Sequence, residues 1–90
     1  VSIYPVGQTT FSTSANTCSD IMTLNNLYAY INQMNTVPVV GVKLYESLYN
    51  GSLFNPFNGG NRFKKMNFGG NFYAVQVDVS GSIVSYVLCS

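Results

Sequence analysis

The sequence predicts a mostly β fold, a small antiparallel sandwich or barrel with a carboxy-terminal hairpin and room for one short helix over about residues 20–34. Three observations predict this class. Apolar and other residues alternate between residues 72 and 90, which is the period of a strand. Clusters of Gly, Asn and Pro separate the apolar segments, as turns do. Finally, a chain of 90 residues that is 47% hydrophobic suits one domain with a modest core.

The amino-terminal segment, residues 1–17, is β-prone and carries no charge. We expect it to form an arm or edge strands, with Ser2–Tyr4 and Thr9–Thr13 as short strands interrupted by Pro5 and Gly7. The alternative is an extended arm that lies on a partner. Residues 18–90 then form a single compact β-rich domain.

Residues 19–35 fit two patterns. Apolar side chains recur there at helical spacing, at Ile21, Leu24, Tyr28 and Ile31. Ser19 or Asp20 would cap such a helix, so we favour a short helix. Alternation over Leu27–Ile31 leaves a strand as the other interpretation.

The middle of the chain predicts a strand followed by a loop. Val37–Tyr45 is apolar and β-branched, and Pro38 confines it to a strand start or an edge. Residues 50–61 are dense in turn formers, which predicts a loop. Phe54 and Phe57 would anchor that loop to the body of the domain.

The carboxy-terminal third predicts a strand or connection over Arg62–Asn67, a turn at residues 69–71 and a final hairpin. Ser80-Gly81 stands where a two-residue turn needs a residue that tolerates positive φ. Pairing across that turn sets three apolar pairs on one face: Val77 with Val84, Val75 with Tyr86, and Tyr73 with Leu88.

The two cysteines, Cys18 and Cys89, lie near opposite ends of the predicted domain. We expect a disulfide between them, which would stabilise the fold by roughly 4 kcal/mol through loop closure and would point to an oxidising compartment. The alternative is two buried thiols that pack as small hydrophobic side chains. Their spacing offers no CxxC redox or zinc motif.

Reactive side chains are scarce. The chain has no His, and its three carboxylates form no recognisable pair, so we expect no catalytic, cofactor-binding or metal-binding residue and no enzyme activity. A net charge of +1 gives no field to attract nucleic acid. Cationic residues and an aromatic residue lie together over residues 62–65, as in proteins that bind single-stranded nucleic acid. We favour the interpretation that these cations protect the edge of a β-strand against aggregation. No apolar stretch is long enough to span a membrane.

The sequence from Cys18 to Cys89 resembles small cysteine-bracketed β modules of phage virion proteins and bacterial surface proteins. The resemblance lies in Leu44-Tyr45, in the Leu53–Asn61 stretch LFNPFNGGN, and in the closing hairpin YAVQVDVSGSIVSYVLC over Tyr73–Cys89. It implies a structural or recognition module without catalytic residues.

Together, the resemblance and the low content of charged residues, 8%, favour a structural virion protein: a capsid decoration (cement) protein or a tail fibre or spike module. It would bind neighbouring capsid or tail subunits and form a homo-oligomer, with a trimer implied by such assemblies. We expect four aromatic residues to contact the partner: Tyr4, Phe11, Phe54 and Phe57. Ordinary core packing is the alternative for all four.

Two other classes remain. One is a secreted or cell-surface module that binds glycan or protein, and the other is a subunit of a bacterial surface fibre. The expected location is the virion, with secretion or the cell surface as the alternative.

Overall fold

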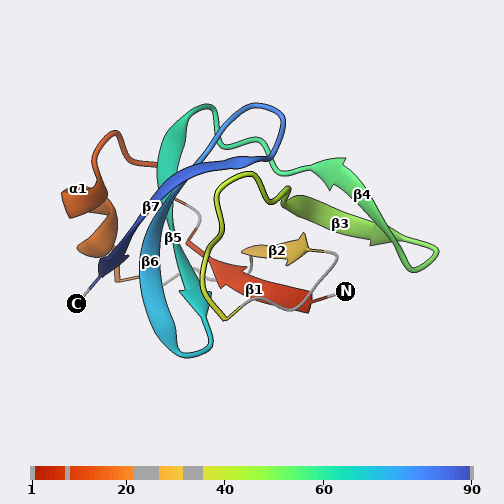
Figure 1. The fold of residues 1–90 in the computed structure, drawn as a ribbon, viewed down its shortest axis with the longest axis horizontal. Helices are drawn as coiled ribbons and strands as arrows, with labels where there is room; N and C mark the ends of the chain where they lie inside the picture. The colour runs from red at the N-terminus through yellow and green to blue at the C-terminus, as the bar shows by residue number, and fades with distance from the viewer. Residues whose placement is uncertain (1, 8, 22–26, 32–35, 90) are drawn as a thin grey trace.

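A computed structural model describes residues 2–7, 9–21, 27–31 and 36–89 and shows a mostly β domain with one antiparallel seven-stranded sheet and one short helix (Figure 1). The fold class predicted from the sequence is therefore confirmed. The strand order is β4-β3-β2-β1-β5-β6-β7. In chain order the elements are β1 (Ser2–Val6), α1 (Ser14–Cys18), β2 (Leu27–Ile31), β3 (Tyr45–Tyr49), β4 (Ser52–Pro56), β5 (Arg62–Phe68), β6 (Asn71–Val77) and β7 (Ile83–Cys89).

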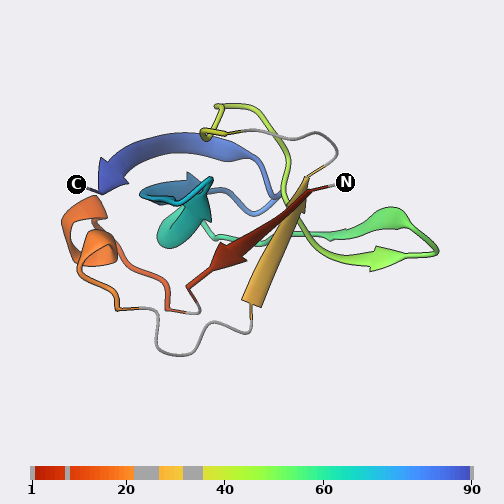
Figure 2. The same ribbon diagram turned by 90° about the horizontal axis from the view of Figure 1, so that it is seen from below.

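The sheet curls back on itself because the residues before β3 pair with the start of β7. The Gly41 N–H donates to the Ile83 carbonyl at 2.8 Å, and the Ile83 N–H donates to the Val42 carbonyl at 3.0 Å. The Leu44 N–H donates to the Gly81 carbonyl at 2.7 Å. These bonds join the segment before β3 to the start of β7 and give the domain the character of a small barrel (Figure 2).

The core fills the concave side of this sheet. Its members are apolar, and every strand except β3 and β4 contributes to them: Tyr4, Val6, Ala29, Ile31, Leu44, Phe57, Met66, Phe68, Tyr73, Val75, Val77 and Ile83. A row of aromatic rings crosses it, with 4.5 Å between the centroids of Tyr4 and Phe68 and 5.9 Å between those of Phe68 and Tyr73. Burial of these side chains is the main source of stability.

The amino-terminal strand belongs to this sheet. β1 lies between β2 and β5, with five residue pairs to β2 from Ser2↔Ile31 to Val6↔Leu27. Phe11 makes a further bridge to Phe63 of β5. Ser2–Val6 is thus an interior strand, which corrects the expectation of an arm or an edge over residues 1–17. Pro5 is accommodated inside β1, where an interruption was expected.

The prediction of a helix over about residues 20–34 is wrong for the residues of that range that the structure describes. Leu27–Ile31 is strand β2, as the alternative had it, and both Ala29 and Ile31 are buried against β1. Residues 22–26 and 32–35 lie outside the described residues. The one helix of the described ranges is α1, which Thr13 caps by accepting a hydrogen bond from the Asn16 N–H. Strand pairing with β1 outweighs the helical spacing of the apolar residues.

The carboxy-terminal hairpin is confirmed, with one change of register. Val75 lies opposite Tyr86 and Tyr73 opposite Leu88, as predicted, but Val77 lies opposite Ile83. A bulge at Val84 causes this shift, because the connection between the strands is wider than two residues.

Two further segments differ from prediction. The predicted strand Val37–Tyr45 is an irregular connection with a turn at Val40-Gly41 and a buried Pro38, and the regular strand begins only at Tyr45. The predicted loop 50–61 contains strand β4. Asn50 and Gly51 have φ of 50° and 78°, the conformation that closes a two-residue hairpin. Within the described ranges, no helix has both the length and the apolar character to cross a membrane.

Candidate interaction surface

The β3–β4 hairpin projects away from the rest of the domain. Figures 1 and 2 both place it at one end of the molecule, with α1 at the other end, along the longest dimension of 36 Å. β3 pairs with β2 only at Tyr45↔Tyr30, so the rest of the hairpin leaves the sheet. β4 pairs with β3 alone among the described strands. The hairpin therefore has both faces open to a partner.

Apolar side chains occupy both faces of this hairpin. Tyr49 and Phe54 lie on one face, with 5.8 Å between their ring centroids, and both are exposed. Leu48 is exposed on the opposite face, where it pairs with the half-buried Leu53. The Ser47 hydroxyl donates to the Phe54 carbonyl at 3.0 Å, which adds a contact between the two strands. We call Leu48, Tyr49 and Phe54 the hairpin patch.

A free-standing two-stranded hairpin is marginal in water, and apolar side chains on both faces add to its hydration cost. This arrangement is typical of an element that a partner covers. The patch carries no charge, so contact with it would depend on shape and apolar area.

The four aromatic residues predicted to contact a partner lie in two different environments. Phe54 is 51% exposed and belongs to the hairpin patch. Phe57 and Tyr4 are only 1% and 6% exposed and belong to the core, so ordinary core packing, the alternative, applies to both. Phe11 is half-buried where it bridges to Phe63.

Sequence reasoning did not select Leu48 and Tyr49. The informative pattern was the Asn50-Gly51 dipeptide, which predicts a hairpin and so places the residues on either side of it opposite one another.

The cations of β5 do not guard an edge, because β5 lies between β1 and β6 in the interior of the sheet. That interpretation is wrong for this strand. Lys64 is buried on the core side, with its Nζ 5.9 Å from the centre of the Phe57 ring. Burial lowers the pKa of Lys64, and the charges of Glu46 and Asp20 oppose this shift. Lys65 points to the other face, so the cations form no continuous basic strip.

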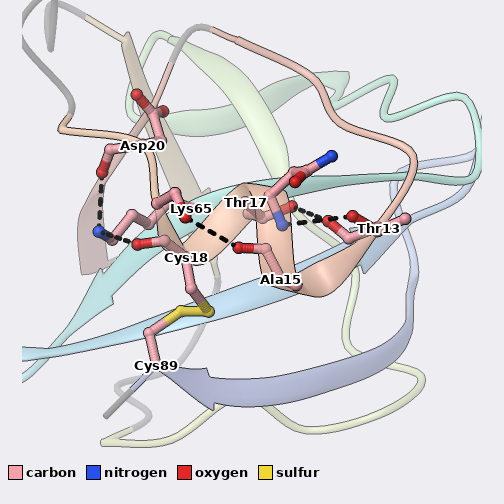
Figure 3. Close-up of a disulfide and its surroundings, with 9 residues drawn as sticks. Thr13, Ala15, Thr17, Cys18, Asp20, Lys65 and Cys89 are labelled. Carbon is pink, nitrogen blue, oxygen red and sulfur yellow. Dashed lines mark hydrogen bonds between the residues drawn. A yellow bond between two sulfur atoms is a disulfide. The ribbon is translucent and has the colours of Figure 1, made fainter.

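Lys65 and the disulfide together attach α1 to the sheet (Figure 3). Cys18 and Cys89 form the expected bridge, with a Cα–Cα distance of 5.3 Å, and the alternative of two free thiols is wrong. The Lys65 Nζ donates to the carbonyls of Cys18 and Asp20 at 2.9 and 2.8 Å, at the carboxyl end of α1 where a cation is favourable. It also lies 5.1 Å from the centre of the Phe72 ring.

An open hollow of about 460 Å³ lies beside α1. It is lined by Phe11, Asn16, Ser19, Asp20 and Ile21. Among the residues that the structure describes, no three His, Cys, Asp or Glu side chains lie close enough together to hold a metal ion. The lining of the hollow combines the apolar side chains of Phe11 and Ile21 with three polar residues.

The connection between β6 and β7 is organised by one carboxylate. Asp78 Oδ1 accepts hydrogen bonds from the Ser80 hydroxyl at 2.7 Å and from the N–H groups of Ser80 and Ser82 at 2.9 and 3.0 Å. Gly81 follows with φ of 89°, a conformation that favours glycine. This turn replaces the predicted two-residue turn and leaves Val79 outside the strand and exposed.

This turn predicts a loss of stability in acid. The hydrogen bonds from Ser80 and Ser82 lower the pKa of Asp78 below its ordinary value of 3.8. The pKa of Asp78 is lower in the folded than in the unfolded protein, so its ionised carboxylate stabilises the fold. This stabilisation is fully present above about pH 4 and is lost as the pH falls through the folded pKa. Thermal unfolding followed by circular dichroism from about pH 5 to about pH 2 should show a falling midpoint. In Asp78→Asn the fall should be smaller, and an identical fall would contradict this role.

No known family model matches this chain, and neither a curated protein nor a solved structure is significantly similar to it.

Proposed function

We propose that this protein is a non-enzymatic structural component of a virion, a phage capsid decoration protein or a tail fibre module, that binds neighbouring virion subunits through its projecting hairpin. The observation that carries the proposal is the hairpin patch: Leu48, Tyr49 and Phe54 are exposed on an element that leaves the sheet. Aromatic residues of this kind are the usual anchors of protein interfaces.

Two other features support the proposal. Only 8% of the residues are charged, so much of the surface suits contact with neighbouring subunits better than contact with water. A disulfide is compatible with an extracellular location, where such bridges persist. The cross-linked barrel would then supply a stable base, and the hairpin would supply the contact.

Incorporation into particles tests this proposal. The protein should co-sediment with purified virions of its source in a fixed ratio to the major capsid or tail protein. Tyr49→Ser combined with Phe54→Ser should lower that ratio at least tenfold, because two central aromatic anchors are removed. The matched control is Val79→Ser, which removes an exposed apolar side chain from the β6–β7 turn and should leave incorporation unchanged.

Three results would contradict the proposal. The chain could remain outside particles as a monomer that a glycan column retains, which would favour a binding module. It could form open filaments alone at high concentration, which would favour a fibre subunit. Finally, the double variant could enter particles as well as the wild type, which would remove the hairpin from the interface.

A further inference from the structure

We propose that two copies of this chain associate through the outer edge of β7, antiparallel about a two-fold axis, so that their sheets become continuous. This contact uses a different surface from the hairpin patch. It holds or fails independently of the proposed virion role.

The outer edge of β7 is open along most of its length. One side of the strand pairs with β6. On the other side the described residues engage only Ile83, through the backbone of Gly41 and Val42. In the described part of the chain, Val84 to Leu88 make no backbone hydrogen bond on that side. Such an edge is a template for pairing with another strand.

The two edges of the sheet differ in how they are protected. β4, at one edge, is five residues long and ends in Asn55, with φ of 62°, and Pro56. A left-handed residue and a proline both interrupt strand pairing. β7, at the other edge, is seven residues long and contains no Pro, Gly or charged residue. Its one irregularity, the bulge at Val84, arises in the pairing with β6, and the covered part of the outer edge is limited to Ile83 among the described residues.

The side chains of β7 suit pairing of the strand with itself. With a two-fold axis near Tyr86, Val84 of each copy lies opposite Leu88 of the other, and the two Tyr86 side chains are adjacent. Val84, Tyr86 and Leu88 are all exposed in the single chain. No Asp, Glu, Lys or Arg occurs over residues 79–90, so the usual obstacle to self-pairing, like charges placed opposite each other, is absent.

A neighbouring segment extends this apolar surface. Residues 36–44 run from the β5–β6 turn, where the Thr36 carbonyl lies near Gly69, to the start of β7, where Gly41 and Val42 pair with Ile83. Along this path three valine side chains are exposed: Val37, Val39 and Val40. Because this segment ends at Ile83 of β7, we expect a second copy on the outer edge of that strand to reach part of it.

The expected affinity follows from the size of this surface. A standard interface takes about 800 Å² from each partner, about one sixth of the 5012 Å² exposed on this chain. One strand edge with part of the neighbouring segment is at the low end of that class. We therefore expect a dimer that dissociates in the micromolar range and tightens as the protein is concentrated.

Tyr86 gives the edge a rigid centre. Its ring packs edge-on against Tyr73 with 6.2 Å between centroids, and Tyr73 in turn packs on Phe68 in the core. The side chain at the two-fold axis is therefore held in place before association, which lowers the entropy lost on binding.

Light scattering coupled to size exclusion, run from low micromolar to millimolar concentration, tests the proposal. The wild-type mass should rise from the 9.8 kDa of one chain toward twice that value. Leu88→Lys should weaken the dimer at least tenfold, because it places a charge opposite the apolar Val84 of the second copy. The matched control, Leu48→Lys on the hairpin, should leave the mass unchanged. Circular dichroism melts confirm that each variant is folded.

A mixing experiment tests the register. Val84→Glu alone should also be monomeric. An equimolar mixture of Val84→Glu and Leu88→Lys should dimerise again, because the new opposite charges face each other across the two-fold axis and the remaining valine faces the remaining leucine. The proposal is overturned by a monomer at every concentration, by a trimer, by a dimer that only Leu48→Lys dissociates, or by a mixture that stays monomeric.

Discussion

Replacing Cys18 and Cys89 together by alanine is expected to lower the free energy of unfolding by about 4 kcal/mol. The bridge joins residues 71 positions apart, and a loop of that length loses much entropy when it is closed in the unfolded chain. Urea denaturation followed by circular dichroism measures the change. For a domain of 90 residues this is a large fraction of the total stability, so the variant should be partly unfolded at 37 °C.

Reduction provides the control for this prediction. The wild-type protein treated with a thiol reductant should unfold at the same urea concentration as the double alanine variant, since both lack the cross-link. A loss below about 1 kcal/mol would contradict the prediction, because it would mean that residual structure in the unfolded chain already holds the two ends together.

Phe57→Ala is expected to cost about 4 kcal/mol, whereas Phe54→Ala should cost about 1 kcal/mol or less. The two phenylalanines are three residues apart, but Phe57 is buried in the core beneath Lys64 and Phe54 is half exposed on the hairpin. Removing a buried ring leaves a cavity, and removing an exposed one does not. Chemical denaturation of both variants measures the difference.

The pair also separates stability from binding. Phe54→Ala should impair partner contact in a folded protein, while Phe57→Ala should act through unfolding. Equal losses of stability for the two variants would contradict the division between core and hairpin patch described above.

Sequence periodicity was most informative where strands pair locally. Most of the β6–β7 hairpin was predicted to the residue, because alternation fixes the face that each side chain takes. The two errors, the pairing of Val77 and the two-residue turn, both arose at the connection, where the Asp78 carboxylate accepts three hydrogen bonds within a wider turn.

Sequence periodicity was least informative where pairing is long-range. Leu27–Ile31 satisfies both helical and strand spacing, and its state depends on β1, which lies more than twenty residues earlier. Likewise, Tyr4 and Phe57 are aromatic residues in uncharged surroundings, and nothing local distinguishes a core ring from a contact ring. Only the folded sheet shows that Phe54 faces outward and Phe57 inward.

The position of the disulfide also determines how the domain would respond to mechanical tension. Residues 18–89 form a covalent ring, and β1 lies outside it. A force applied between the two ends of the domain would pass from Cys18 directly to Cys89, so six of the seven strands would carry no load. Only the segment before Cys18 could be pulled away, and its attachments are the backbone pairing of β1, the core contacts of Tyr4 and Val6, the Phe11–Phe63 bridge and helix α1. The oxidised domain would therefore yield by a single short extension, and the reduced one by unravelling throughout.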